Sequence, residues 1–265
     1  ETLTNRVERE ISEGLLPAAQ IAIGFENKIL FSKNFGDTKP DSLFCIFSAT
    51  KAITSAASWL LMQEKVISEN DLVNEYIPNY RANGKAKTTL SHLLTHTAGF
   101  PHAPFKPIEW KSKEARLRRF EQWRSFWEPG TKFEYHPSSS MYVVAEIIER
   151  ASGQHFESFV QDHILNPLQL KNTFIGLPDD QSSRALPIRY CGVELSRQEY
   201  EEMGFPVPPE TEVTEDAVLS FNEREVQASG IPGGGAFSNA EDMAMFYQAL
   251  LHGGTNQERL WQDDM

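Results

Sequence analysis

A serine and a lysine three residues apart, Ser48 and Lys51, are the side chains of this 265-residue sequence best suited to covalent chemistry. Residues 43–47 before them are apolar and β-prone. After them, apolar residues recur at helical spacing at Ile53, Ala56, Ala57, Leu60 and Leu61. Ser48 is therefore predicted in the first turn of a buried helix, with Lys51 one turn further along the same face. A serine hydroxyl becomes a nucleophile when a base takes its proton, and an amine can do so once burial lowers its pKa.

The S-x-x-K spacing alone is a weak signal, because it occurs by chance roughly once in a chain of this length and average composition. The alternative is a serine N-cap with a solvated lysine. The start of a helix would also favour an oxyanion developing near Ser48, because backbone N–H groups and the positive end of the helix dipole lie there.

Tyr135 is the second candidate, because the turn Pro129-Gly130 precedes it and a predicted helix begins at 138. A phenol near a lysine ammonium can have its pKa lowered enough to act as a base, and its hydroxyl can return the proton to a leaving group. The alternative is a core tyrosine with a hydrogen-bonded hydroxyl.

The elements that must position these residues follow from periodicity and turn residues. A β-hairpin is predicted over 17–25 and 28–35, turning at Glu26-Asn27. Helices are predicted over 3–13, 48–64, 71–78, 89–97, 112–126, 138–151, 155–165 and 240–251. Segment 176–230 is predicted to be irregular or short-strand structure, and no run of strands is evident after residue 230. Residues 238–241 would form a capping box at the start of the last helix if Ser238 is its N-cap.

The chain is predicted to form one α/β (α+β) domain over 1–265, with an antiparallel sheet and a large helical region. Within it, 1–47 form a helix and hairpin, 48–175 a helical lobe, and 176–265 a variable segment and a return helix. Composition is ordinary for a globular protein, with 40% hydrophobic residues. The formal charge of −12 argues against nucleic acid and anionic membranes as partners.

No apolar run approaches the roughly 20 residues of a membrane span, so a soluble chain is expected, either cytoplasmic or in a mature exported form. The two cysteines, Cys45 and Cys191, are predicted to be buried free thiols. His92 and His96 have a spacing that can bind zinc, but no third ligand is evident, so packed histidines bonded to backbone are favoured. No metal or organic cofactor is expected, and the oligomeric state stays open.

The sequence resembles the serine hydrolases of the class C β-lactamase, family VIII-type carboxylesterase and D-Ala-D-Ala carboxypeptidase superfamily. The resemblance rests on four sequence motifs that occur in the same order as in the family and together span nearly the whole chain. They are residues 47–51 with S-x-x-K, 90–99, 129–135 and 233–242. The resemblance implies a β-lactamase/transpeptidase-like fold. It also implies that Ser48 is the nucleophile, Lys51 its activating amine and Tyr135 the general base and acid.

Two departures from the family pattern limit this resemblance. The family's tyrosine motif ends in an asparagine that binds substrate and the lysine, and Pro137 replaces it here, which favours esters over amides or lactams. The family also carries a third motif on a core strand. The nearest match, His252-Gly253-Gly254, ends a predicted helix, so the third motif and the C-terminal strands are expected to be missing from this sequence.

Three further assignments are predicted around this site. His136, Pro137, Gly234 and Gly235 are candidate substrate-binding residues, although a solvent-facing loop position is an equal alternative for His136. The glycines at 233–235 are expected to allow a close backbone approach rather than to bind phosphate. The aromatic and basic stretch 110–127 either walls an acyl pocket or packs as an amphipathic helix.

The function favoured is a serine hydrolase acting through an acyl-enzyme on a small ester or amide substrate, most plausibly a carboxylesterase. A β-lactamase or D-Ala-D-Ala carboxypeptidase is the first alternative. A non-catalytic or incomplete binding protein is the second.

Overall fold

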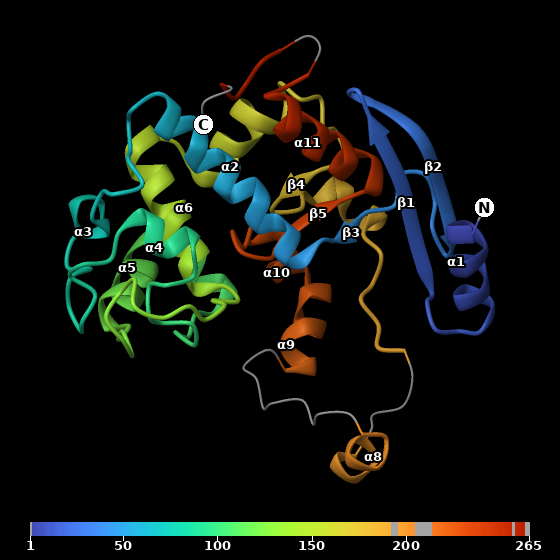
Figure 1. Ribbon diagram of the computed structural model, residues 1–265, viewed down its shortest axis with the longest axis horizontal. Helices are drawn as coiled ribbons and strands as arrows, with labels where there is room; N and C mark the ends of the chain where they lie inside the picture. The colour runs from blue at the N-terminus through green and yellow to red at the C-terminus, as the bar shows by residue number, and fades with distance from the viewer. Residues whose placement is uncertain (1, 192–195, 205–213, 256–257, 263–265) are drawn as a thin grey trace.

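A helix and a β-hairpin form one edge of the molecule (Figure 1). The structure, a computed structural model, describes residues 2–191, 196–204, 214–255 and 258–262. Helix α1 spans Thr2–Ser12, and strands β1 (Ala18–Phe25) and β2 (Lys28–Gly36) pair antiparallel. Glu26 and Asn27 in the turn have φ values of 49° and 57°, as a type I′ hairpin turn requires. The predicted helix and hairpin are confirmed.

A second, three-stranded antiparallel sheet lies at the centre of the molecule, in the order β3-β5-β4. Its strands are β3 (Phe44–Cys45), β4 (Phe174–Ile175) and β5 (Ala236–Ser238). The sequence did not reveal β5, but one short strand after residue 230 does not contradict the expectation that no run of strands follows there. Strand β5 is three residues long and buried throughout, so it has no alternating pattern that the sequence could reveal, and both of its partners are distant in the chain.

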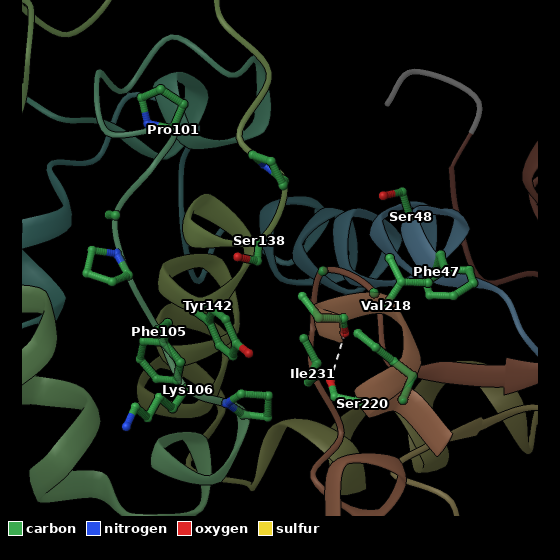
Figure 2. A pocket seen from close by; sticks show the side chains of 18 residues that line it. Phe47, Ser48, Pro101, Phe105, Lys106, Ser138, Tyr142, Val218, Ser220 and Ile231 are labelled. Carbon is green, nitrogen blue, oxygen red and sulfur yellow. Dashed lines mark hydrogen bonds between the residues drawn. The ribbon is translucent and has the colours of Figure 1, made fainter. Parts of the chain in front are cut away.

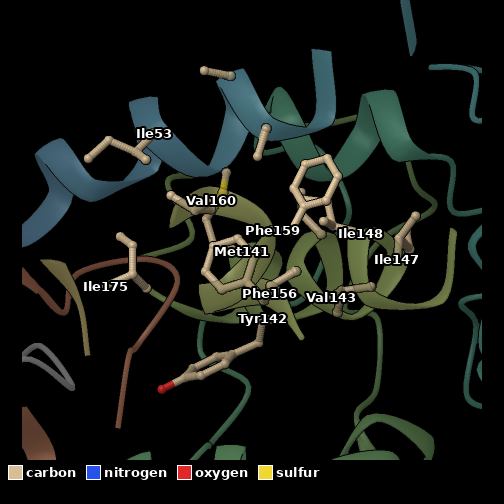
Figure 3. Close-up of a cluster of buried hydrophobic side chains, with 14 of the residues drawn as sticks. Ile53, Met141, Tyr142, Val143, Ile147, Ile148, Phe156, Phe159, Val160 and Ile175 are labelled. Carbon is tan, nitrogen blue, oxygen red and sulfur yellow. The ribbon is translucent and has the colours of Figure 1, made fainter. Parts of the chain in front are cut away.

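The helical lobe contains the elements predicted between 48 and 165, with shorter bounds for several of them. They are η1 (Phe47–Ala49), α2 (Thr50–Gln63), α3 (Val73–Tyr76), α4 (Leu90–Leu94), η2 (Pro107–Lys111), α5 (Lys113–Gln122), α6 (Ser139–Ser152), α7 (Phe156–Val160) and the π-helical turn η3 (Gln161–Leu165). Helices α2 and α6 pack against each other across a cluster that includes Ile53, Met141 and Ile148 (Figure 3). Full burial of each such side chain contributes roughly 1.5–3 kcal/mol, which fixes α2 behind Ser48.

The described part of segment 176–230 is mostly short helices, so the prediction of irregular or short-strand structure is wrong. They are η4 (Asp179–Arg184), α8 (Arg197–Glu202), α9 (Glu215–Leu219), η5 (Ser220–Asn222) and α10 (Arg224–Ala228). The Ser196 and Thr214 side chains accept hydrogen bonds from backbone N–H groups three residues on, as N-caps do. These caps start helices in a stretch whose proline and glycine content suggested none.

The last helix, α11 (Ala240–His252), packs against β1. Its N-cap is Asn239, whose side chain accepts the Asp242 N–H at 2.8 Å, so Ser238 does not form the capping box that the sequence left possible. Ser238 lies in β5, and its hydroxyl is 2.8 Å from that of Thr173. Gly253 ends the helix with φ 75°, so the interpretation of 252–254 as a helix end is confirmed.

Neither cysteine is in a disulfide: Cys45 is half-buried and Cys191 is exposed. Both cysteines are free thiols, as predicted. The prediction that Cys191 is buried is wrong, because this residue lies in an exposed stretch of the chain. Within the described residues, no helix combines the length and apolar character needed to cross a bilayer.

A buried ionic cluster joins α5 to α6. Arg116 bonds to both Glu146 and Glu149, and Arg150 bonds to Glu146 at 2.7 Å. The Glu146 side chain is fully buried and Arg116 nearly so. Each charge has a partner of opposite sign, so the cluster links α5 to α6 without leaving an unpaired charge in the core.

Replacing Glu146 with alanine is expected to lower the free energy of unfolding by about 3–5 kcal/mol, because it removes the buried carboxylate that Arg116 and Arg150 share and leaves Glu149 as the remaining partner of Arg116. Urea unfolding of both proteins measures the loss. The matched control is Glu201→Ala in the exposed pair Arg197–Glu201, where the change should be within about 0.5 kcal/mol. Equal effects at the two sites would contradict a structural role for the cluster.

Candidate active site

The candidate nucleophile lies where strand β3 passes into helix α2. Ser48 is in the tight turn η1, and its side chain is exposed, whereas Lys51, one turn further on, is only 8% exposed. Phe47, immediately before Ser48, has φ 41°, a left-handed conformation that a bulky residue rarely adopts. The hydroxyl is therefore presented at the surface of a site whose amine is enclosed.

The Lys51 Nζ has three oxygen partners that come from three separate parts of the chain. It lies 3.1 Å from Ser48 Oγ, 2.6 Å from the Pro137 carbonyl oxygen and 2.7 Å from the Gly233 carbonyl oxygen. An ammonium can donate to all three. A neutral amine can donate to the two carbonyls and direct its lone pair at the Ser48 hydroxyl. Both protonation states that proton transfer requires are therefore accommodated.

Tyr135 completes the group, with its hydroxyl 2.7 Å from Ser48 Oγ. The phenol ring also lies close to the amine, with Lys51 Nζ 5.1 Å from the ring centroid. On its other side the ring packs against His96, with centroids 4.8 Å apart. The structure thus brings together the three predicted side chains from positions 48, 51 and 135.

The electrostatic setting favours proton exchange among these groups. Burial lowers the pKa of the Lys51 ammonium, and contact with Tyr135 opposes this only in part. Partial burial acts to raise the pKa of Tyr135, but the interaction with Lys51 and the hydrogen bond with Ser48 outweigh it, so the pKa lies below its usual value. Both shifts favour the form of each group that can accept a proton.

His136 is not a substrate-binding residue, and it is not a solvent-facing loop residue either. It is fully buried, with Nδ1 2.6 Å from the Glu134 carbonyl oxygen and Nε2 accepting the Phe100 N–H at 3.1 Å. A carbonyl only accepts, so Nδ1 carries the hydrogen and the ring is neutral. Burial lowers the pKa of His136 to about 4, in agreement with this assignment. The ring thereby ties the backbone just before Tyr135 to the segment at Phe100.

The neighbouring histidines also bond to backbone, as predicted. His92 Nδ1 accepts the Thr89 N–H at 3.2 Å, and His96 Nδ1 accepts the His136 N–H at 3.2 Å. Burial and the positive charge of Lys51 lower the pKa of His96, which keeps the ring neutral and able to accept. His96 was not assigned to the site from the sequence, although its left-handed φ of 58° marks the turn that brings it under Tyr135.

A cavity of about 470 Å³ opens beside Ser48 (Figure 2). One wall is the segment 101–107, with Phe105, and the opposite wall is the segment 217–221, with Phe221; Tyr142 lies between them. Most of the lining side chains are apolar, as is usual for a small-molecule site. Neither wall was recognised in the sequence, because nothing local in either segment indicates that they face each other.

Of the remaining predicted substrate contacts, Pro137 and Gly234 line this cavity. Gly235 does not: it is buried, and a Cβ there would lie 2.7 Å from the Ile231 nitrogen, so it serves close packing and the prediction of a substrate contact is wrong. The glycines at 233–235 were expected to bring the backbone close to the site. The hydrogen bond from Lys51 Nζ to the Gly233 carbonyl oxygen confirms this expectation.

The aromatic stretch 110–127 packs into the core rather than walling the cavity. Trp110, Phe120 and Trp123 are buried, and Phe126 is exposed away from the site. The alternative of an amphipathic helix packing its aromatic side is therefore the correct one.

Comparison with known proteins identifies the family. The model of the family described as Beta-lactamase matches residues 4–264. The chain belongs to this family. Protein flp of Staphylococcus aureus (strain MW2) is 31% identical over 183 residues, which cover 63% of this chain and 36% of that protein. A Beta-lactamase of Yersinia enterocolitica is 26% identical over 69% of this chain and 47% of its own length. The matched region is thus less than half of each of these relatives.

Solved structures of the same fold cover nearly the whole chain. A family VIII carboxylesterase matches with a TM-score of 0.81 at 23% identity, over 98% of this chain and 72% of that chain. EstA from Arthrobacter nitroguajacolicus Rue61a matches with a TM-score of 0.80 at 23% identity, over 100% and 72%. The mixed α/β, β-lactamase/transpeptidase-like architecture predicted from the sequence is therefore confirmed.

The depressed pKa of His136 predicts how stability depends on pH. The unfolded chain binds a proton near pH 6.5 and the folded chain only near pH 4, so stability is complete above about 6.5 and falls as the pH drops toward 4. The loss is on the order of 3 kcal/mol. Urea unfolding from pH 7 to pH 4 measures it, and His136→Gln should remove most of this slope whatever its effect at pH 7. An unchanged slope would contradict the assignment.

Proposed function

We propose that this chain is a serine hydrolase that works through an acyl-enzyme, and that its substrates are carboxylic esters. The observation that carries the proposal is the meeting of three groups at one hydroxyl: Ser48 Oγ lies 3.1 Å from Lys51 Nζ and 2.7 Å from the Tyr135 hydroxyl. These distances are within the reach that proton transfer to a base requires. Membership of the Beta-lactamase family supports the same chemistry.

In the first half of the reaction, Ser48 Oγ attacks the ester carbonyl carbon and forms the new C–O bond. Its proton passes to the basic partner, Tyr135 as the phenolate or Lys51 as the neutral amine, and the carbonyl oxygen becomes an oxyanion. The backbone N–H of Ser48, in the turn η1 that leads into α2, is the donor that family membership suggests for that oxyanion. When the tetrahedral intermediate collapses, the bond to the alcohol breaks, and the same partner returns the proton to the leaving alkoxide.

In the second half, water repeats the sequence on the acyl-enzyme. The partner takes a proton from the water, hydroxide adds to the acyl carbon, and the Ser48–acyl bond breaks with return of the proton to Ser48 Oγ. The product is the free carboxylic acid, and the enzyme is regenerated without any change of oxidation state. A single proton relay serves both halves because Tyr135 and Lys51 both lie beside the serine.

Two features favour esters over amides or lactams. Pro137 gives its carbonyl to Lys51 and offers no side-chain amide that could hold a substrate amide. The cavity walls are apolar, and among the described lining residues the charged side chain is Lys106, on the segment that forms the outer wall. The apolar walls suit an ester with an apolar acyl or alcohol group. The relatives named as β-lactamases make lactam hydrolysis the second candidate.

Ser48 is expected to be the residue that a fluorophosphonate labels and that an ester acylates. Ser48→Ala should abolish both labelling and turnover of p-nitrophenyl acetate, because Ser48 supplies the hydroxyl that both the amine and the phenol contact. Peptide mapping by mass spectrometry locates the label. Ser12→Ala, at an exposed position on α1, is the matched control and should behave as wild type. A label on another residue, or turnover that survives Ser48→Ala, would refute the proposal.

Ester preference is tested by comparing p-nitrophenyl acetate with a chromogenic cephalosporin. We expect kcat/KM for the ester to exceed that for the cephalosporin by at least about a hundredfold, because Pro137 offers no donor for the lactam amide. Pro137→Asn should narrow this ratio by restoring such a donor. A higher kcat/KM for the cephalosporin in the wild-type protein would favour the β-lactamase alternative.

A further inference from the structure

Phe47 holds the nucleophile through a backbone conformation that needs support. Its φ of 41° lies in the left-handed region, and such a conformation in a bulky residue costs on the order of 1–3 kcal/mol. It persists only where neighbouring groups prevent relaxation. Because Phe47 is directly bonded to Ser48, any relaxation would rotate the serine away from Lys51 and Tyr135.

The Phe221 ring is the side chain placed to prevent that relaxation. Its centroid lies 5.3 Å from that of the Phe47 ring, with the planes inclined by 59°, an ordinary packing geometry for two aromatic rings. Gly234 lies beside both residues: a Cβ there would be 4.0 Å from Phe221 Cζ and 3.9 Å from the Phe47 carbonyl carbon. Phe47 therefore contacts an aromatic ring and lies close to a glycine backbone.

The backbone next to Phe221 is itself held in place by hydrogen bonds. It lies in the turn η5, and the next residue, Asn222, accepts the Ile188 N–H at 2.8 Å and donates to the Ile188 carbonyl at 3.0 Å. Arg224, just beyond, bonds to Asp179 at 2.6 Å. These contacts fix the backbone on the C-terminal side of the ring, so Phe221 can act as a rigid support.

We propose that Phe221 is a positioning residue for Ser48 as well as a wall of the substrate cavity. Its ring keeps Phe47 in the left-handed conformation, and so keeps Ser48 Oγ within reach of Lys51 and Tyr135. This inference rests on the proposed hydrolase function. One side chain then links the shape of the cavity to the alignment of the nucleophile, which a wall residue alone would not do.

The test separates the two roles by substrate size. p-Nitrophenyl acetate has an acyl group too small to depend on the distal wall, whereas p-nitrophenyl hexanoate fills the cavity. If Phe221 positions Ser48, Phe221→Ala lowers kcat for the acetate ester and the rate of fluorophosphonate labelling by about tenfold or more, because misplacement of about 1 Å is enough for such a loss. If Phe221 is only a wall, the variant raises KM for the hexanoate and leaves kcat for the acetate unchanged, which overturns the proposal.

Three further variants complete the design. Phe221→Tyr keeps the ring and should restore kcat for the acetate to within about twofold of wild type, whereas Phe221→Leu, which keeps apolar volume without the ring, should be intermediate and guards against misfolding of the alanine variant. Phe126→Ala removes an exposed aromatic ring that does not line the cavity and is the matched control. Failure of Phe221→Tyr to restore kcat would overturn the proposal.

A crystal structure of Phe221→Ala tests the support role without relying on activity. We expect Phe47 to leave the left-handed region and the distance from Ser48 Oγ to the Tyr135 hydroxyl to exceed about 3.5 Å, beyond hydrogen-bond reach. An unchanged Phe47 would overturn the support role. Absence of both labelling and ester turnover in the wild-type protein would instead refute the proposed function, and the crystal structure would still decide whether Phe221 holds Phe47.

Discussion

The buried ammonium of Lys51 is the contact on which the site depends. It donates to the carbonyls of Pro137 and Gly233, which are 86 and 182 residues away in the chain, and it lies beside Ser48. Removing a charge of this kind from water is costly unless its hydrogen bonds are replaced, and two carbonyls and a hydroxyl replace them here. To form these hydrogen bonds, the segments that carry Ser48, Pro137 and Gly233 must all lie around the amine. The hydrogen bonds of Lys51 therefore also assemble the site.

The residues that support the site are buried, whereas Ser48 and Tyr135 are exposed to solvent. Helix α2 is buried along the face that carries Ile53, and α6 packs against it, so Lys51 cannot move without disturbing the core. Behind Tyr135, the fully buried His136 bonds to backbone on two sides. Ser48 and Tyr135 are nevertheless exposed. Reacting groups that are accessible but attached to an immobile support meet the requirement for precise geometry without closing off the substrate.

Local signals in the sequence were enough to predict much of this arrangement. The helix at Ser48 and Lys51 follows from apolar periodicity, and the hairpin follows from its turn residues. What could not be predicted depends on distant partners. Strand β5 is too short for a pattern, His136 is buried by segments that its own neighbours do not reveal, and the cavity walls at 101–107 and 217–221 meet only through the tertiary fold. Asn239 replaced Ser238 as a cap because β5 already uses Ser238.

Pro137 contacts Lys51 but has no side-chain group that could also bind substrate. A proline has a fixed φ and a free carbonyl, so it can accept from Lys51 as well as any residue can, and it does so at 2.6 Å. It has no side-chain group with which to bind a substrate amide. Apart from Ser48 Oγ, the oxygens that hold the amine are backbone carbonyls, so in the proposed hydrolase the activation of Ser48 does not depend on a side chain that also binds substrate. In the proposed hydrolase, recognition then falls to the apolar walls of the cavity, which include Phe105 and Phe221. A site organised in this way selects by the shape and apolarity of the acyl or alcohol group rather than by polar contacts to the bond that breaks.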